Sequence, residues 1–264
     1  MHRSAPATPH KAPAPAQRIR LARVLACAAV PVMLVAVGCS SDSGAKKKTD
    51  TSSASSSSSS SSASSSASGG KQASASPSLA PAKFAKLPEA CQSVGEKTID
   101  TYVPKAKTKA GEVGKTADPQ SQASCTWNGL DDKGVDGSQY RWLDVDLKRY
   151  DSTPGLGSGE ALAQKQFDHA VSSARSTSDA TNVKSDPVPG LGDQATAIVF
   201  NLKKSDADFS YAVVVVRTAN AVVTLDYNGA GFQGADGPDT GDVLKGATDA
   251  AKEAVAAVAT ANNK

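Results

Sequence analysis

The chain has 264 residues and a formal net charge of +3, with 29 lysines and arginines against 26 acidic residues. Five of the positive side chains lie within the first 23 residues, where no acid occurs, whereas residues 86–264 carry 19 positive and 24 negative side chains. The basic character therefore belongs to the amino-terminal segment and does not indicate a nucleic-acid-binding protein.

An export signal is predicted over residues 1–38. Residues 24–37, VLACAAVPVMLVAV, form an apolar run behind the basic segment. A transmembrane helix needs about 20 apolar residues, so this shorter run is typical of a secretory signal peptide.

The end of this signal, VAVGC, resembles the lipobox of bacterial lipoproteins. The resemblance implies cleavage after Gly38 and a diacylglyceryl group on the thiol of Cys39, which becomes the new amino terminus. It departs from the usual pattern at Ala36, where lipoboxes usually have Leu. Since two acyl chains give stable anchoring, we expect a lipid-anchored protein on the extracellular face of the cell membrane. Ordinary secretion with a free cysteine is the alternative.

Residues 39–85 are expected to form the lipidated cysteine and a disordered tether. The segment contains TSSASSSSSSSSASSSASGG and has no apolar periodicity. Such a sequence cannot bury enough surface to offset its ordering entropy. A flexible coil of this length spans roughly 35–40 Å.

Residues 86–264 are expected to form a single extracellular domain. Apolar residues recur at helical spacing in three segments and alternate in five others. The predicted elements, in chain order, are a helix at 87–104, strands at 121–129 and 140–150, a helix at 160–175, strands at 194–202, 211–218 and 221–228, and a helix at 240–261.

The order α-β-β-α-β-β-β-α predicts an α+β fold. Adjacent strands with short connections pair antiparallel, and Ala219–Asn220 is a candidate two-residue hairpin turn. We therefore expect a mostly antiparallel five-stranded sheet with about three helices packed on it.

Cys91 and Cys125 are the two cysteines of this domain. An even pair in an exported domain predicts a disulfide, which would tie the first helix to the first strand. The chain-entropy model gives about 3.5–4 kcal/mol for a loop of this size. Metal binding by two cysteines without neighbouring histidines is disfavoured.

Several segments resemble the exported lipoprotein domains of streptomycetes and other actinobacteria that are classed as domains of unknown function. The layout is also similar to the extracellular sensor-like domains of some mycobacterial kinases and related lipoproteins. The resemblance covers roughly residues 88–260 and implies a disulfide-tied cell-surface domain without a catalytic residue to carry over. The segments that carry it are EAC, CTW, LDVDLKRYDS, VPGLGDQA and VVRTANAVVTLDYNG.

Candidate catalytic groups are few. His169 is the one histidine of the mature chain and falls beside, not on, the apolar stripe of its helix, so we expect it at the surface. Asp144 and Asp146 share one face of a strand, and paired carboxylates can cleave glycosides. Alternating polar residues are equally typical of a half-solvated strand, so no catalytic residue is predicted.

The same strand offers a candidate ligand-contacting face. Tyr140, Trp142 and Tyr150 lie on or next to its polar side, and exposed aromatic rings suit sugars or lipids.

The glycines of STPGLGSGEA, residues 152–161, follow a strand and precede a helix, as in a dinucleotide site. Glu160 stands where a third glycine is needed, and the parallel βαβ unit is missing. We expect a turn, with Ser158 as the N-cap of the following helix. Residues 131–137 and 111–116 likewise lack the residues that a calcium loop and a phosphate-binding loop require. No metal or cofactor is predicted.

Two functions follow from these patterns. We expect a non-enzymatic cell-surface module that binds an extracellular ligand or a protein partner. The alternative is an exported hydrolase acting on cell-wall or extracellular glycans through carboxylates such as Asp144 and Asp146. That alternative requires two carboxyl groups converging in a cleft, with a raised pKa on one of them.

Overall fold

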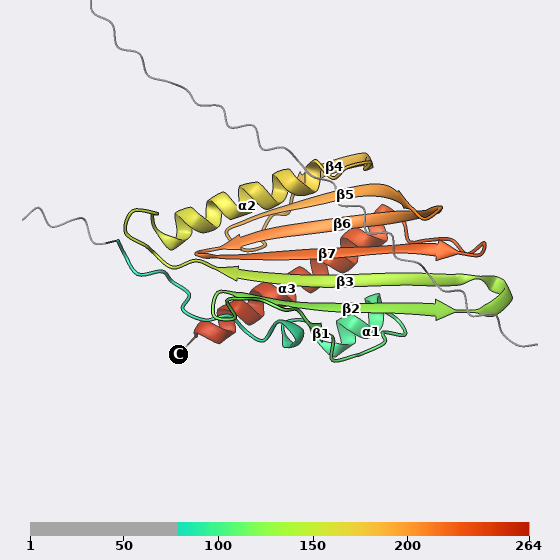
Figure 1. The fold of residues 1–264 in the computed structure, drawn as a ribbon, viewed down its shortest axis with the longest axis horizontal. Helices are drawn as coiled ribbons and strands as arrows, with labels where there is room; N and C mark the ends of the chain where they lie inside the picture. Colours follow the sequence, from blue (N-terminus) through green and yellow to red (C-terminus); the bar gives the residue numbers. More distant parts are fainter. Residues whose placement is uncertain (1–78, 264) are drawn as a thin grey trace, which may run out of the picture. The chain divides into compact units, whose positions relative to one another are not determined.

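The computed structural model describes residues 79–263, and Cys39 lies outside this range. Seven strands form one antiparallel sheet in the order β1-β2-β3-β7-β6-β5-β4 (Figure 1). The strands are β1 (Glu112–Val113), β2 (Gln122–Asp132), β3 (Ser138–Arg149), β4 (Thr181–Pro187), β5 (Gln194–Lys204), β6 (Ala207–Thr218) and β7 (Ala221–Phe232). The helices are α1 (Glu96–Tyr102), α2 (Gly159–Arg175) and α3 (Thr240–Asn262), with 3₁₀ turns η1 (Ala90–Gln92) and η2 (Gly134–Asp136).

The prediction of an α+β fold with three helices and an antiparallel sheet is confirmed, but the sheet has seven strands rather than five. The additional strands, β1 and β4, lie at its two edges, so the element order also differs from the prediction. Strand β1 is two residues long, and all of β4 except Ser185 is exposed. Neither strand buries a face, so neither shows the apolar alternation by which strands are recognised.

The predicted first helix is broken in two. Turn η1 ends at Gln92, and α1 begins only after Gly95. The Ser93 hydroxyl donates to the Ala90 carbonyl at 2.6 Å, and the Gly95 N–H donates to Glu253 of α3 at 2.7 Å. These bonds replace helical ones, so α1 keeps only the last two turns of the predicted helix.

One face of the sheet is covered by α3, together with α1 and η1 (Figure 1). Leu143, Val145 and Leu147 of β3 are fully buried on this face. The facing stripe of α3 consists mostly of alanines, which lets the helix pack closely on the sheet.

The predicted disulfide joins Cys91 of η1 to Cys125 of β2 on this same face. Cys125 is fully buried, next to Trp127. Gly111 lies so close that a Cβ on it would stand 2.3 Å from the Cys125 sulfur.

Helix α2 packs on the opposite face. Its buried residues Ala163, Phe167 and Val171 contact the β5–β6–β7 part of the sheet, near the hairpin between β6 and β7. The predicted N-cap is confirmed, because the Ser158 hydroxyl accepts the Ala161 N–H at 3.2 Å. Gly159 is required there, since a Cβ would lie 2.3 Å from the Tyr150 carbonyl oxygen.

Asn220, in the predicted β6–β7 turn, holds the segment that precedes the domain. Its side chain accepts the Phe84 N–H at 2.7 Å and donates to the carbonyls of Phe84 at 2.9 Å and Tyr150 at 2.8 Å. Phe84 falls near the end of the predicted tether, residues 39–85, but it is buried, with 5 % of its surface exposed.

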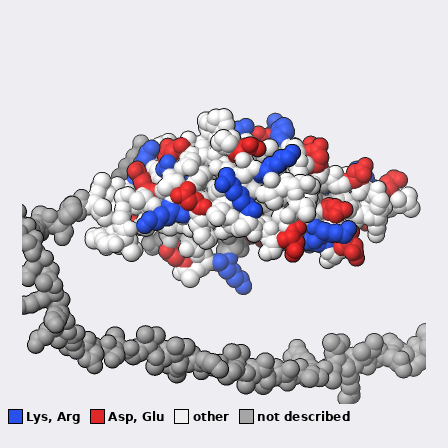
Figure 2. All heavy atoms as spheres, turned by 90° about the horizontal axis from the view of Figure 1, so that it is seen from above, with Lys and Arg blue, Asp and Glu red and all other residues white. Residues whose placement is uncertain are grey.

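Charged side chains of both signs are interspersed on the surface shown in Figure 2. Within residues 79–263, no helix is both long and apolar enough to cross a membrane.

Candidate functional site

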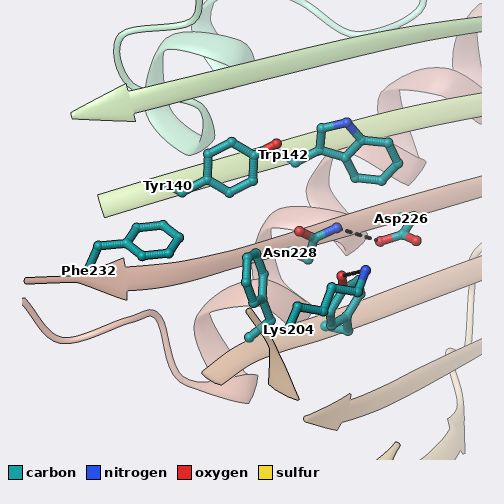
Figure 3. Close-up of a pocket in the computed structure, with 8 residues that line it drawn as sticks. Tyr140, Trp142, Lys204, Asp226, Asn228 and Phe232 are labelled. Carbon is teal, nitrogen blue, oxygen red and sulfur yellow. Dashed lines mark hydrogen bonds between the residues drawn. The ribbon is translucent and has the colours of Figure 1, made fainter. Parts of the chain in front are cut away.

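Helix α2 leaves much of its sheet face uncovered, and a hollow of about 430 Å³ lies there. We call it the aromatic groove (Figure 3). It is lined by Tyr140 and Trp142 from β3, Lys204 from β5, Phe209 and Tyr211 from β6, and Asp226, Asn228 and Phe232 from β7.

The register of three neighbouring strands explains the hollow. Ala230 of the central strand β7 lies between Tyr140 of β3 and Phe209 of β6. Two residues earlier in β7, on the same face, Asn228 lies between Trp142 of β3 and Tyr211 of β6. Small or short side chains on the central strand thus form a floor between larger rings on both sides.

The rings contact one another around Phe209. Its centroid lies 6.2 Å from those of Tyr140, Tyr211 and Phe232, and the Tyr140 and Phe232 contacts are edge-to-face. Such contacts contribute about 0.5–1.5 kcal/mol each, so the rings hold a defined arrangement without a covering helix.

The groove continues on both sides. A hollow of about 450 Å³ between α2 and the sheet shares Lys204, Tyr211 and Asp226 with it. Another of about 530 Å³ shares Tyr140 and Phe232. The uncovered face therefore offers room for an elongated ligand.

Two carboxyl groups lie next to the Trp142–Asn228 pair on the same face of the sheet. Asp226 of β7 is directly opposite Asp144 of β3. Burial raises the pKa of Asp226 to about 6; the neighbouring Asp144 charge raises it too, while a hydrogen bond from Asn228 opposes the rise. Burial also raises the pKa of Asp144, against a 2.6 Å hydrogen bond from the Thr126 hydroxyl. The pair therefore ionises less readily than ordinary carboxyl groups.

Lys204 brings a positive charge to the same hollow. Its Nζ donates to the Tyr211 hydroxyl at 2.6 Å and lies 5.0 Å from the centre of the Tyr211 ring and 6.0 Å from that of Phe209. The ammonium group therefore lies at the hydroxyl rim of the Tyr211 ring and at the outer limit of a cation–π contact with Phe209.

The structure brings together two of the three aromatic residues named from the sequence. Tyr140 and Trp142 line the groove, whereas Tyr150 lies beyond the end of β3 and lines a separate hollow of about 230 Å³ beside Arg149. Arg149 is buried there and forms an ion pair with Asp151.

The carboxylates named from the sequence are placed differently. Asp144 and Asp146 share the uncovered face of β3, but Asp146 is paired with Lys148 at 3.1 Å. The carboxyl group opposite Asp144 is that of Asp226, which sequence reasoning missed. Its signal was the alternation of polar Thr224, Asp226 and Asn228 in β7. His169 is exposed on α2, as expected.

Within residues 79–263, no group of three or more His, Cys, Asp or Glu side chains is placed to hold a metal ion. Comparison with models of known protein families, with curated proteins and with solved structures finds no match to this chain.

Proposed function

We propose that the chain is a lipid-anchored cell-surface protein whose folded part binds an extracellular ligand in the aromatic groove and performs no chemistry on it. The observation that carries this proposal is the two rows of rings on β3 and β6, on either side of β7, which α2 leaves open except at buried Tyr211. Ligand sites are typically concave and largely apolar, with a few polar groups that orient the ligand. Asp226, Asn228 and Lys204 are those polar groups here.

The ligand is best sought on protein from its own host. Native mass spectrometry of the full mature chain, purified from membranes, is expected to detect a co-purifying small molecule or peptide. Replacing Phe209 by Ala removes the central ring, so the bound mass should disappear. Phe84→Ala, which removes a buried ring from the cluster on the α3 face, outside the residues that line the groove, is the matched control. An unchanged bound mass in the Phe209 variant would contradict the proposal.

Trp142 provides an independent readout in solution. The chain has two tryptophans, and Trp127 is 1 % exposed on the opposite face. A ligand in the groove should therefore change the emission of Trp142 alone. The change should vanish in Trp142→Phe, and an equal change in that variant would place the ligand elsewhere.

We propose in addition that Cys39 carries the anchor and that the chain belongs with the actinobacterial exported lipoproteins its sequence resembles. Cys39→Ser should then move the protein from the membrane fraction to the soluble fraction, and the mature wild-type protein should incorporate labelled palmitate. Without incorporation, the alternative of ordinary secretion would hold.

A glycan hydrolase is the second candidate, and the opposed carboxyl groups of Asp144 and Asp226 favour it. Directly opposite residues have Cβ atoms about 4.5–5.5 Å apart, which lets two carboxyl groups flank one glycosidic bond. Release of reducing ends from purified cell-wall glycan by the full chain tests this function. Turnover that both Asp144→Asn and Asp226→Asn abolish would replace the binding proposal with the enzymatic one.

A further inference from the structure

The aromatic groove already holds an ammonium group, and it belongs to the chain itself. The Lys204 amine donates to the Tyr211 hydroxyl, at the rim of that ring, and lies 6.0 Å from the centre of the Phe209 ring. Lys204 lies at the end of β5, beside the turn into β6, and is exposed. The groove thus accommodates an ammonium group beside these rings, within about 6 Å of their centres.

The floor of the groove carries two carboxyl groups that form no ion pair within residues 79–263; Lys204, whose charge reaches Asp226, donates to Tyr211 instead. Among the residues that the structure describes, neither Asp144 nor Asp226 takes part in an ion pair, whereas Asp146 on the same face is paired with Lys148. Like charges directly opposite in a sheet are unfavourable. A positively charged group between the rings and Asp226 would relieve this repulsion.

We propose that the aromatic groove binds an organic ammonium group, a primary amine or quaternary ammonium on an apolar or sugar-like body, with the cation against Asp226 and the body along the rings of Trp142 and Phe209. The inference rests on the proposed binding function and names the chemical class of the ligand. Lys204 acts in the free protein as an internal competitor, because its amine occupies part of the same aromatic surface.

Choline and its uncharged isostere 3,3-dimethylbutan-1-ol test the charge directly. Each is titrated at pH 7 and constant ionic strength into the full mature chain in a polyoxyethylene detergent, with Trp142 emission as the readout. Choline should bind at least about tenfold more tightly than the alcohol, the ratio expected of a cation–π and carboxylate contact. Equal affinities would overturn the inference.

Two variants give opposite expected shifts. Asp226→Asn should weaken choline binding about tenfold, because the carboxylate is lost. Lys204→Met should strengthen it several-fold, because the competing amine is removed. Lys203→Met is the matched control, since Lys203 faces Asp208 outside the groove and should leave affinity unchanged. Weaker choline binding by the Lys204 variant would contradict the inference.

Three probes distinguish the sources of such a ligand. Choline represents a lipid headgroup, glucosamine an amino sugar and Nα-acetyl-lysine amide a peptide side chain, and the tightest of them identifies the source. If none of the three binds while the mass-spectrometric ligand is retained by wild type and lost in Phe209→Ala, the ammonium inference fails and the binding function stands.

Discussion

Asp226 lies opposite Asp144 in the sheet, and the two carboxyl groups raise each other's cost of ionisation in a partly desolvated floor. Nothing in the packing requires an acid there, because an amide of the same shape could keep a hydrogen bond with Asn228. A residue that lowers stability where a neutral one would fit is the kind of residue that function retains. The unfolding free energy that the Asp226 carboxyl costs can be measured.

Replacing Asp226 by Asn is expected to raise the free energy of unfolding at pH 7 by up to about 3 kcal/mol, the equivalent of a pKa of about 6 against 3.8 for a free carboxyl. Below about pH 3 the carboxyl is protonated in both states, so the variant and the wild type should be equally stable. As pH rises from about 3 to 6, the unfolded chain ionises first and only the wild type loses stability. Urea unfolding at several pH values measures the difference.

Asp146→Asn is the control for this experiment. Asp146 shares the face but is paired with Lys148, so its replacement should not reproduce the pH-dependent gain. A stability difference between wild type and the Asp226 variant that stays constant from pH 4 to 7 would contradict the raised pKa.

The same ionisation predicts how ligand affinity depends on pH. The groups facing Asp226 are Asp144 on β3, Lys204 on β5, Tyr211 on β6 and Asn228 on β7. Because a cation binds the ionised carboxylate, choline affinity should rise about tenfold between pH 5 and 7. Repeating the Trp142 titration with Asp226→Asn should give a flat profile, and a wild-type affinity that falls over this range would exclude Asp226 as the cation's partner.

At the scale of elements, the sequence predicts those that bury a face and misses those that do not. The five central segments alternate or run apolar because one or both of their faces are buried, and the β6–β7 turn and the Ser158 cap follow from local chemistry. Edge strands β1 and β4 are held by backbone hydrogen bonds, which leave little trace in side-chain pattern. The predicted first helix is longer than α1 because the apolar spacing of the sequence continues across Gly95.

The groove was only partly predictable for a related reason. Alternation places Tyr140 and Trp142 on the polar face of β3, but it does not say which strand lies beside them. Strand β7 is far away in sequence and lies next to β3 only because β4, β5 and β6 fold back on its other side. Asp226 and Phe209 therefore join the site through long-range strand order.

Asn220 joins three elements through one buried amide, and replacing it by Ala is expected to cost about 2–4 kcal/mol of unfolding free energy. The change leaves the Phe84 and Tyr150 backbone groups unpaired and releases the segment around Phe84. Limited proteolysis should then cleave that segment faster than in wild type. Exposed Asn263→Ala is the matched control, and wild-type stability and proteolysis in the Asn220 variant would show that the amide is dispensable.

At the scale of the whole folded unit, one face of the sheet carries the main core and the other carries the proposed binding site. The face under α3 holds the large core and the disulfide, whereas the other face is divided between α2 and the aromatic groove. Trp127 and Trp142 belong to the same sheet but to opposite faces. Changes on the α3 face should therefore alter stability without altering the groove, whereas removing an exposed ring of the groove, unlike replacing buried Asp226, should alter binding more than stability.

The double replacement Cys91→Ser and Cys125→Ser tests this separation. Loss of the cross-link between η1 and β2 should lower the free energy of unfolding by about 3–4 kcal/mol. Choline affinity at 25 °C should stay within about twofold of wild type, because the disulfide lies on the far face of the sheet.

Trp142→Ala should give the reverse result, weak binding with nearly unchanged stability. Both quantities can be followed on one sample by urea unfolding and by competitive titration with a fluorescent choline analogue. A disulfide-free protein that folds but binds tenfold more weakly would mean that the two faces are coupled through β3.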